Sequence, residues 1–219
     1  MDVVARARQL WEVLADRPGS FPGSGAAVVV APASKLCPPG WCGTVTIGGA
    51  TLVTCPDEWS AEQMRGAVPW EELAAATLGP AHLAYLDPAR FRPAGAADAV
   101  GKDELRQLLS VVDEEEADEC GLEEIDSLAY ALEVKGEIVA AAGYKRWPDD
   151  AAHLCVLTHP AHRGRGLARR VASAAVEAAL SEGLFAQWRA RPVASRKVAA
   201  ALGFEDIGTQ FSLRLKESR

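Results

Sequence analysis

The sequence predicts an α/β protein of the α+β kind, with a sheet flanked by helices and an extra N-terminal α+β module. Three observations carry this prediction. Two pairs of β-rich runs are each joined by a short turn with glycine, at Gly48-Gly49 and at Lys135-Gly136. In the second half, strand-like runs alternate with helix-like runs that end at glycine. The 219 residues are 49% hydrophobic, enough to bury a core.

The N-terminal part reads as helix, strands and helix. Ala7, Leu10 and Leu14 fall at helical spacing in the opening segment. The following elements are expected to be a strand at 25–31, a hairpin at 44–54, a capped helical stretch from Ser60 that is interrupted near Pro69 and resumes through Leu78, and a short strand at 82–86.

A boundary between two domains is expected at residues 87–102, which contain two prolines and few bulky side chains. We therefore expect an α+β module of unknown role over residues 1–95 and a second domain over residues 96–219. The elements expected after the boundary are a helix at 103–112, an acidic run at 113–126, strands at 128–134, 138–144 and 153–158, a helix at 167–180, a strand at 185–190, a helix at 193–202 and closing strands at 207–215.

Composition and charge exclude several classes of partner. The net charge of −7 argues against nonspecific binding to nucleic acid or anionic lipid. No apolar run is long enough to span a membrane. Acidic residues in the opening helix argue against a targeting peptide, so a cytoplasmic protein with free thiols is expected. Metal is not expected, because the spacing of Cys37, Cys42 and Cys55 matches no common zinc site.

The segment Arg163-Gly164-Arg165-Gly166-Leu167-Ala168 stands between an expected strand and an expected helix. The first N–H groups of a helix lack internal partners and favour phosphate. Glycines allow a sharp turn and close approach of a ligand, and arginines add charged donors. These residues therefore predict a binding site for pyrophosphate. The alternative is a glycine-containing turn whose arginines are solvated. The P-loop and Rossmann patterns are absent.

This segment lies in VLTHPAHRGRGLARRVASAAVEAAL, which resembles motif A of the GCN5-related N-acetyltransferases (GNAT). Further on, VASRKVAAALGFEDIG resembles the motif B helix of that family, ending at Gly203-Phe204. The order of elements from Asp103 also fits. The resemblance covers roughly the C-terminal half, and residues 1–95 resemble no family that we identify.

The resemblance implies a GNAT fold, with a mixed, mostly antiparallel, twisted sheet that opens into a V. It also implies acetyl-CoA as co-substrate, with no metal. Its pantetheine arm would pair with Val156, Leu157 and Thr158, and its pyrophosphate would bind the amides of residues 163–168. Ser195 keeps a hydroxyl that is common early in motif B.

The implied reaction is direct transfer of an acetyl group to a primary amine of a small molecule or peptide. Candidate catalytic residues are His153, Asp150 and Tyr144, although each also fits an ordinary structural role. Ala199 stands at the position where the family often has a tyrosine that acts as general acid. Pro192 stands where the family often has an asparagine. These departures keep open a second function, a non-catalytic acyl-CoA-binding sensor or scaffold.

The acidic run suggests the charge of the acceptor. In the family, the segment before the first hairpin helps to form the acceptor entrance, and concentrated negative charge attracts cations. A small cationic amine is therefore expected, with a solvated helix face as the alternative. We expect the N-terminal module to form part of the wall of the acceptor site. Its alternative role is to form the interface of a homodimer. The acidic residues are Asp113, Glu114, Glu115, Glu116, Asp118 and Glu119.

Overall fold

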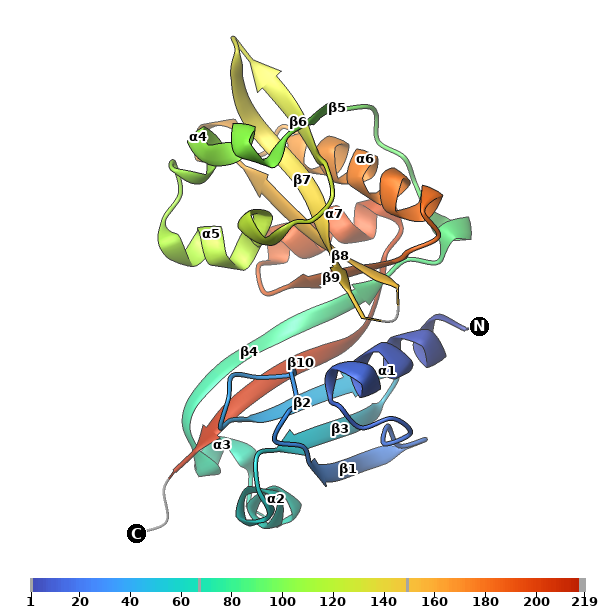
Figure 1. The fold of residues 1–219 in the computed structure, drawn as a ribbon, viewed down its shortest axis with the longest axis vertical. Helices are drawn as coiled ribbons and strands as arrows, with labels where there is room; N and C mark the ends of the chain where they lie inside the picture. Colours follow the sequence, from blue (N-terminus) through green and yellow to red (C-terminus); the bar gives the residue numbers. More distant parts are fainter. Residues whose placement is uncertain (1, 67, 149, 217–219) are drawn as a thin grey trace. The chain divides into compact units, whose positions relative to one another are not determined.

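The computed structural model describes residues 2–66, 68–148 and 150–216. By their internal contacts, the residues form two compact units (Figure 1). The first unit comprises Met1–Leu83 and Asp206–Arg219, and the second comprises Ala84–Glu205. The sequence predicted two domains divided after residue 95. The two units differ from these domains, because the last strand of the chain belongs to the first unit. The domain assignment itself stays a prediction. No helix in the described ranges is both long and apolar enough to cross a bilayer.

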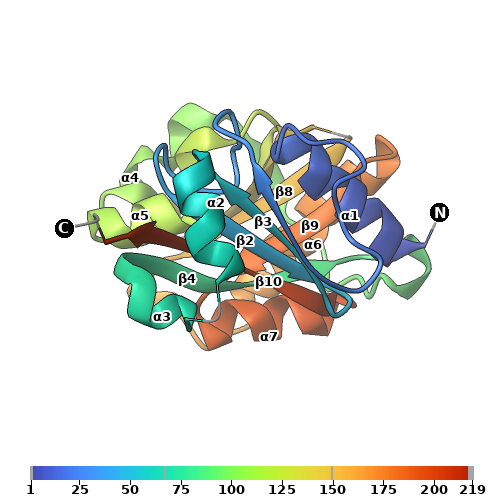
Figure 2. The same cartoon turned by 90° about the horizontal axis from the view of Figure 1, so that it is seen from below.

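The first unit is a five-stranded sheet with helices. Its sheet has the order β1-β3-β2-β10-β4, in which β1 is parallel to β3 and β2 is antiparallel to both β3 and β10. Helix α1 contacts β2, and α2 contacts β1 and β3 (Figure 2). The elements are α1 Val3–Leu14, β1 Gly25–Val30, β2 Cys42–Ile47, β3 Ala50–Cys55, α2 Glu58–Arg65, α3 Trp70–Leu73, β4 Ala74–Tyr85 and β10 Glu205–Leu215.

The hairpin expected at residues 44–54 is present as β2 and β3, with Ile47 opposite Ala50. The prediction that a helix continues through Leu78 is wrong. The helix ends at Leu73, and the alanine-rich segment that follows is the first half of β4. Alanine favours a helix locally, but pairing with β10 decides the conformation here. The strands approach closely: a Cβ at Gly79 would lie 2.8 Å from the carbonyl oxygen of Gln210.

The second unit contains a mixed, mostly antiparallel sheet with the order β9-β8-β7-β6-β5, as the sequence predicts. Only the pair β8–β9 is parallel; β5–β6, β6–β7 and β7–β8 are antiparallel. The elements are η1 Pro88–Arg90, β5 Asp98–Val100, η2 Lys102–Leu105, α4 Arg106–Leu109, α5 Glu114–Cys120, η3 Leu122–Glu124, β6 Ala129–Val134, β7 Glu137–Trp147, β8 Ala151–Thr158, η4 Pro160–His162, α6 Leu167–Ser181, β9 Phe185–Ala190 and α7 Val193–Leu202.

Two details of the second unit differ from the sequence prediction. The helix expected at 103–112 is a 3-10 turn followed by the single turn α4, because a new helix begins at the cap Asp113. The Asp113 carboxylate accepts from the Glu116 N–H at 2.8 Å. The expected boundary segment also contains β5, which pairs with β6 at the edge of the sheet.

Alternate residues of the central strands face two separate cores, since side chains on a strand alternate in direction. Ala152 and Leu154 of β8 belong to a core formed with α6 and α7. Cys155 and Leu157 belong to a second core with Leu105 and other residues of the segment before β6. Figure 1 shows α4 and α5 on one side of these strands and α6 on the other.

Strands β8 and β9 pair only at their first residues. Ala151 to His153 lie opposite Phe185 to Gln187, and the parallel register ends with the pair His153 and Gln187. Beyond this pair, residues of both strands line a pocket. The fold therefore leaves one edge of β8 without a strand partner next to the pocket.

Candidate functional site

The second unit contains a pocket of about 520 Å³ between the separated ends of β8 and β9. Its walls also include α5, the loop after β8, and the first turns of α6 and α7. Apart from Arg165, which is exposed, all the binding residues predicted from the sequence line this pocket: Val156, Leu157, Thr158, Arg163, Gly164, Gly166, Leu167, Ala168 and Ser195. The structure thus brings together residues from β8, the loop and α7.

The loop has the backbone that a site for an anion needs. Gly164 and Gly166 have φ values of 76° and 77°, in the left-handed region that favours glycine. Gly166 is the N-cap of α6, so the amides of Leu167 and Ala168 are in the first turn and lack intrahelical partners. A Cβ at either glycine would meet no atom within 4 Å. The space beside the loop is therefore open to a ligand.

Three buried polar atoms on the pocket wall lack a hydrogen-bond partner within the described ranges. They are Thr158 Oγ1, His162 Nδ1 and Arg169 Nε. Buried polar groups are normally satisfied, because leaving one unpaired costs about 1–3 kcal/mol. All three lie at the loop end of the pocket, where an anion would also meet the positive end of α6. These groups fit an anionic ligand at this end.

Helix α5 is attached to both sides of the pocket by ion pairs. Arg163 donates from Nε to the Thr158 carbonyl at 3.1 Å, and its guanidinium contacts the Glu116 carboxylate. Arg191, just after β9, donates to Glu119 at 2.6 and 2.9 Å. Glu116 and Glu119 both line the pocket. The charge of Arg163 is therefore already paired within the protein, in contrast to its expected role as a donor to phosphate.

None of the three candidate catalytic residues lines the pocket. Tyr144 points to the α6 side of the sheet, where its hydroxyl donates to Glu182 Oε1 at 2.6 Å. Burial and this bond to a carboxylate raise the pKa of Tyr144. Asp150 is an exposed turn residue with φ 53°, and its carbonyl accepts from the Phe185 N–H at 2.8 Å. Neither residue lines the pocket.

His153 directly precedes the pocket residue Leu154 and lies on the opposite face of the sheet from Tyr144. Its Nδ1 is 2.6 Å from Gln187 Oε1, and its ring stacks on Trp147 with centroids 4.4 Å apart. Burial lowers the pKa of His153 to about 4, although the bond to Gln187 opposes this effect. The imidazole is therefore neutral near pH 7 and a weak base. The structure does not bring the three candidates together.

The partly buried His153 should make stability depend on pH. The unfolded chain binds this proton near pH 6.5, whereas the folded chain binds it only near pH 4. Stability should therefore fall as the pH drops from about 6.5 toward 4, by up to about 2–3 kcal/mol. Urea unfolding at pH 7 and pH 4.5 will measure this loss, and His153→Gln should reduce it. The same loss in the parent and in the variant would contradict the assignment.

Thiol chemistry is disfavoured in this region. Burial raises the pKa of Cys155 to about 12, and it also raises the pKa of Cys120, which lines the pocket. Both thiols stay protonated near neutral pH, whereas a nucleophilic cysteine needs the thiolate. Within the described ranges, no group of three or more His, Cys, Asp or Glu is placed to hold a metal ion.

The sequence analysis missed some residues of the site. His162, Arg169 and Trp188 line the pocket, but none was singled out as a binding residue. A signal existed for Arg169, because it lies in the first turn of a helix that begins at the glycine loop. No local signal exists for Trp188, because its place in the pocket depends on where β9 stops pairing with β8.

Comparisons with known proteins agree with this geometry. Residues 126–210 match a family model described as GNAT acetyltransferase. A comparison with curated proteins gave no match. A GNAT-family acetyltransferase from Colwellia psychrerythraea is similar over 67% of this chain and 59% of its own length, with 16% identity and a TM-score of 0.51. A GNAT-family protein from Novosphingobium aromaticivorans is similar over 66% of this chain and 67% of its own, with 18% identity and a TM-score of 0.50.

At these identities the solved structures establish the fold. The chain has the GNAT fold, with a mixed sheet whose strands β8 and β9 separate around the pocket. The family match covers both motifs that the sequence analysis singled out. Over residues 126–210, this chain is therefore similar to the GNAT acetyltransferase family in sequence, and it shares the fold of that family.

Proposed function

We propose that this chain transfers an acetyl group directly from acetyl-CoA to a primary amine of a small molecule or peptide. The observation that carries the proposal is the loop of residues 163–168 at the mouth of the pocket. Its two left-handed glycines, the free amides of α6 and the unpartnered Arg169 Nε suit the phosphates of CoA. The family match over residues 126–210 supports the same reading.

The free edge of β8 suits the pantetheine arm. Because β9 stops pairing after Gln187, the backbone groups of residues 154–158 on that side have no strand partner. An extended arm with amide groups can take the place of the missing strand, so that these N–H and C=O groups are satisfied. The pocket residues of this chain thus fit acetyl-CoA along its length, from Arg169 at one end to Leu154 at the other.

The chain's own residues would contribute positioning more than acid–base chemistry. Bound acetyl-CoA supplies the activated acyl group as a thioester. A backbone N–H on the free edge of β8 is available to bond to the acyl oxygen. His153 is neutral and can accept a hydrogen bond from an amine, but it cannot take a proton efficiently from an ammonium with pKa near ~10. The raised thiol pKa values of Cys120 and Cys155 favour direct transfer.

A second function, binding of acyl-CoA without transfer, has specific observations in its favour. Ala199 stands where the family often has tyrosine, and it is buried in the core with 1% of its surface exposed. The pKa of His153 is low for a general base. A sensor or scaffold would bind acetyl-CoA and release no CoA in the presence of amines. Turnover against a panel of amines separates these functions.

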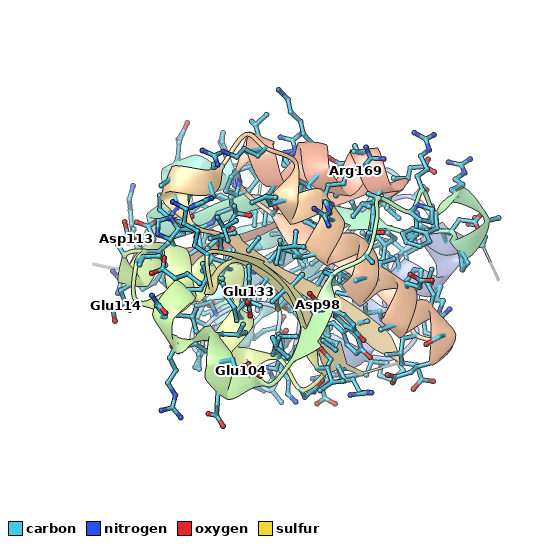
Figure 3. The ribbon with its side chains drawn as sticks, turned by 90° about the horizontal axis from the view of Figure 1, so that it is seen from above. Asp98, Glu104, Asp113, Glu114, Glu133 and Arg169 are labelled. Carbon is cyan, nitrogen blue, oxygen red and sulfur yellow. The ribbon has the colours of Figure 1, made fainter. Side chains whose placement is uncertain are left out.

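We further propose that the acceptor is cationic. Helix α5 borders the pocket, and its side chains Asp113, Glu114, Glu115 and Asp118 are exposed. Glu114 lies on the outer side of this helix (Figure 3), whereas the Asp113 carboxylate caps its N-terminus. Glu116 and Glu119 form ion pairs with Arg163 and Arg191, and Asp113 caps the helix. The exposed carboxylates of Glu114, Glu115 and Asp118 therefore supply the remaining negative charge. Such a rim raises the local concentration of cations.

The acceptor proposal predicts kinetics that depend on salt. In the amine panel, polyamines or other cationic amines should be preferred to anionic ones. For the preferred amine, kcat/KM should fall several-fold as salt rises, because exposed charges are screened over about 8 Å at physiological ionic strength. Changing Glu114, Glu115 and Asp118 together to neutral amides should lower kcat/KM at low salt and flatten its salt dependence.

A matched control lies on the same unit. Glu133 and Glu137 are exposed acids near the turn of the β6–β7 hairpin, and neither lines the pocket. Their conversion to glutamine should leave the salt dependence unchanged. A preferred acceptor with net negative charge would overturn the proposal of a cationic acceptor, as would kinetics that are indifferent to salt and to the α5 changes.

A further inference from the structure

The pocket has a polar end and an apolar end. The unpartnered polar atoms of Thr158, His162 and Arg169 lie at the loop end. Leu154 and Trp188 lie at the opposite end, where β8 and β9 meet. With a rise of about 3.3 Å per residue, β8 runs about 13 Å from Thr158 to Leu154. A ligand whose anionic end binds the loop therefore directs its other end toward Leu154 and Trp188.

Leu154 and Trp188 close the inner end of the pocket. Each is the first residue after the last register pair, His153 and Gln187. Both side chains join the core formed with α6 and α7, and Trp188 is only 3% exposed. The large indole therefore occupies the space that opens when the two strands begin to separate.

The indole is fixed by two contacts. Its Nε1–H donates to Ser195 Oγ at 3.0 Å, and its ring meets Phe204 edge to face with centroids 5.5 Å apart. To move aside, the indole would have to give up this aromatic pair and leave a buried N–H without an acceptor. Trp188 is therefore a rigid wall rather than an adaptable one.

We propose that Trp188, held by Ser195 and Phe204, restricts the acyl group of the bound acyl-CoA to short chains such as acetyl. This inference rests on the proposed function, because it assumes that CoA phosphates bind the loop. A two-carbon acyl group would end in front of the indole. A chain of eight carbons would have to displace it or leave the pocket, and would lose favourable contacts in either case.

Binding to the full chain tests the proposal without any acceptor. We would measure dissociation constants of CoA, acetyl-CoA and octanoyl-CoA by isothermal titration calorimetry. The parent should bind octanoyl-CoA at least about tenfold more weakly than acetyl-CoA. Trp188→Leu should bind octanoyl-CoA at least about tenfold more tightly than the parent does, because each newly buried methylene strengthens binding about fourfold. For each protein the affinity for octanoyl-CoA is divided by its affinity for CoA, which carries no acyl chain to bury, so that a general change in CoA binding cancels.

Two further variants keep the test decisive. Trp188→Phe keeps a ring beside Phe204 and should fold even if Trp188→Leu does not; it should show a smaller shift toward octanoyl-CoA. Phe185→Leu is the matched control, because Phe185 is a buried aromatic residue on β9 that does not line the pocket. Phe185→Leu should keep the parent's ratio of the two dissociation constants.

The outcomes distinguish the two proposals. If neither CoA nor acetyl-CoA binds the parent, the proposed function fails and this inference fails with it. If acetyl-CoA binds but octanoyl-CoA binds the parent equally well, only the role of Trp188 is overturned. An unchanged ratio in both Trp188 variants, or an equal shift in Phe185→Leu, overturns it as well.

Discussion

Replacing Gly166 with aspartate is expected to abolish binding of acetyl-CoA. Gly166 caps the N-terminus of α6 at φ 77°, and a side chain there would enter open space beside the loop. A carboxylate at this point repels phosphate and competes for the same free amides. The measurement is the rise in melting temperature with acetyl-CoA, which follows mass action in the parent and should disappear in the variant.

A control for Gly166→Asp exists just past the other end of the same helix. Gly183 has φ 76°, and a Cβ there would also meet no atom within 4 Å. Gly183→Asp therefore carries the same charge and a similar backbone strain of about 1–2 kcal/mol. It should lower the melting temperature without changing the response to acetyl-CoA. If Gly166→Asp binds acetyl-CoA as the parent does, the assignment of the loop is wrong.

Elements with strong local signals could be predicted from the sequence. The hairpin of β2 and β3 has glycines at its turn, and α7 ends at Gly203, which has φ 101°. The binding loop could be predicted for the same reason, because residues 163–168 are contiguous and stand directly between a strand and a helix. In each case the turn or cap is encoded within a few neighbouring residues.

Features that depend on pairing between distant segments could not be predicted. The local sequence at the start of β4 predicts a helix, and pairing with β10, more than a hundred residues away, makes it a strand. The catalytic candidates depend instead on the register between the consecutive strands β7 and β8. Lys145 pairs with His153 and Tyr144 pairs with Leu154, so this register places Tyr144 and His153 on opposite faces of the sheet.

Removing residues 1–91 is expected to unfold or aggregate the remaining chain. In the first unit, β10 pairs with β2 from Gly208 opposite Ile47 to Leu213 opposite Cys42. Leu213 is fully buried in a core with residues of β2, β3 and α2. A chain that begins at Arg92 keeps β10 but loses these partners, which leaves an apolar strand with an unpaired edge.

This truncation can be compared with a matched fragment of residues 84–205, which omits β10 together with its partners. That fragment retains every strand from β5 to β9 and all residues that line the pocket. We expect residues 92–219 to show no cooperative thermal unfolding and to sediment as aggregates, and residues 84–205 to be the more soluble of the two. If residues 92–219 fold and keep full acetyl transfer, the N-terminal segment has no part in completing the fold or the acceptor site.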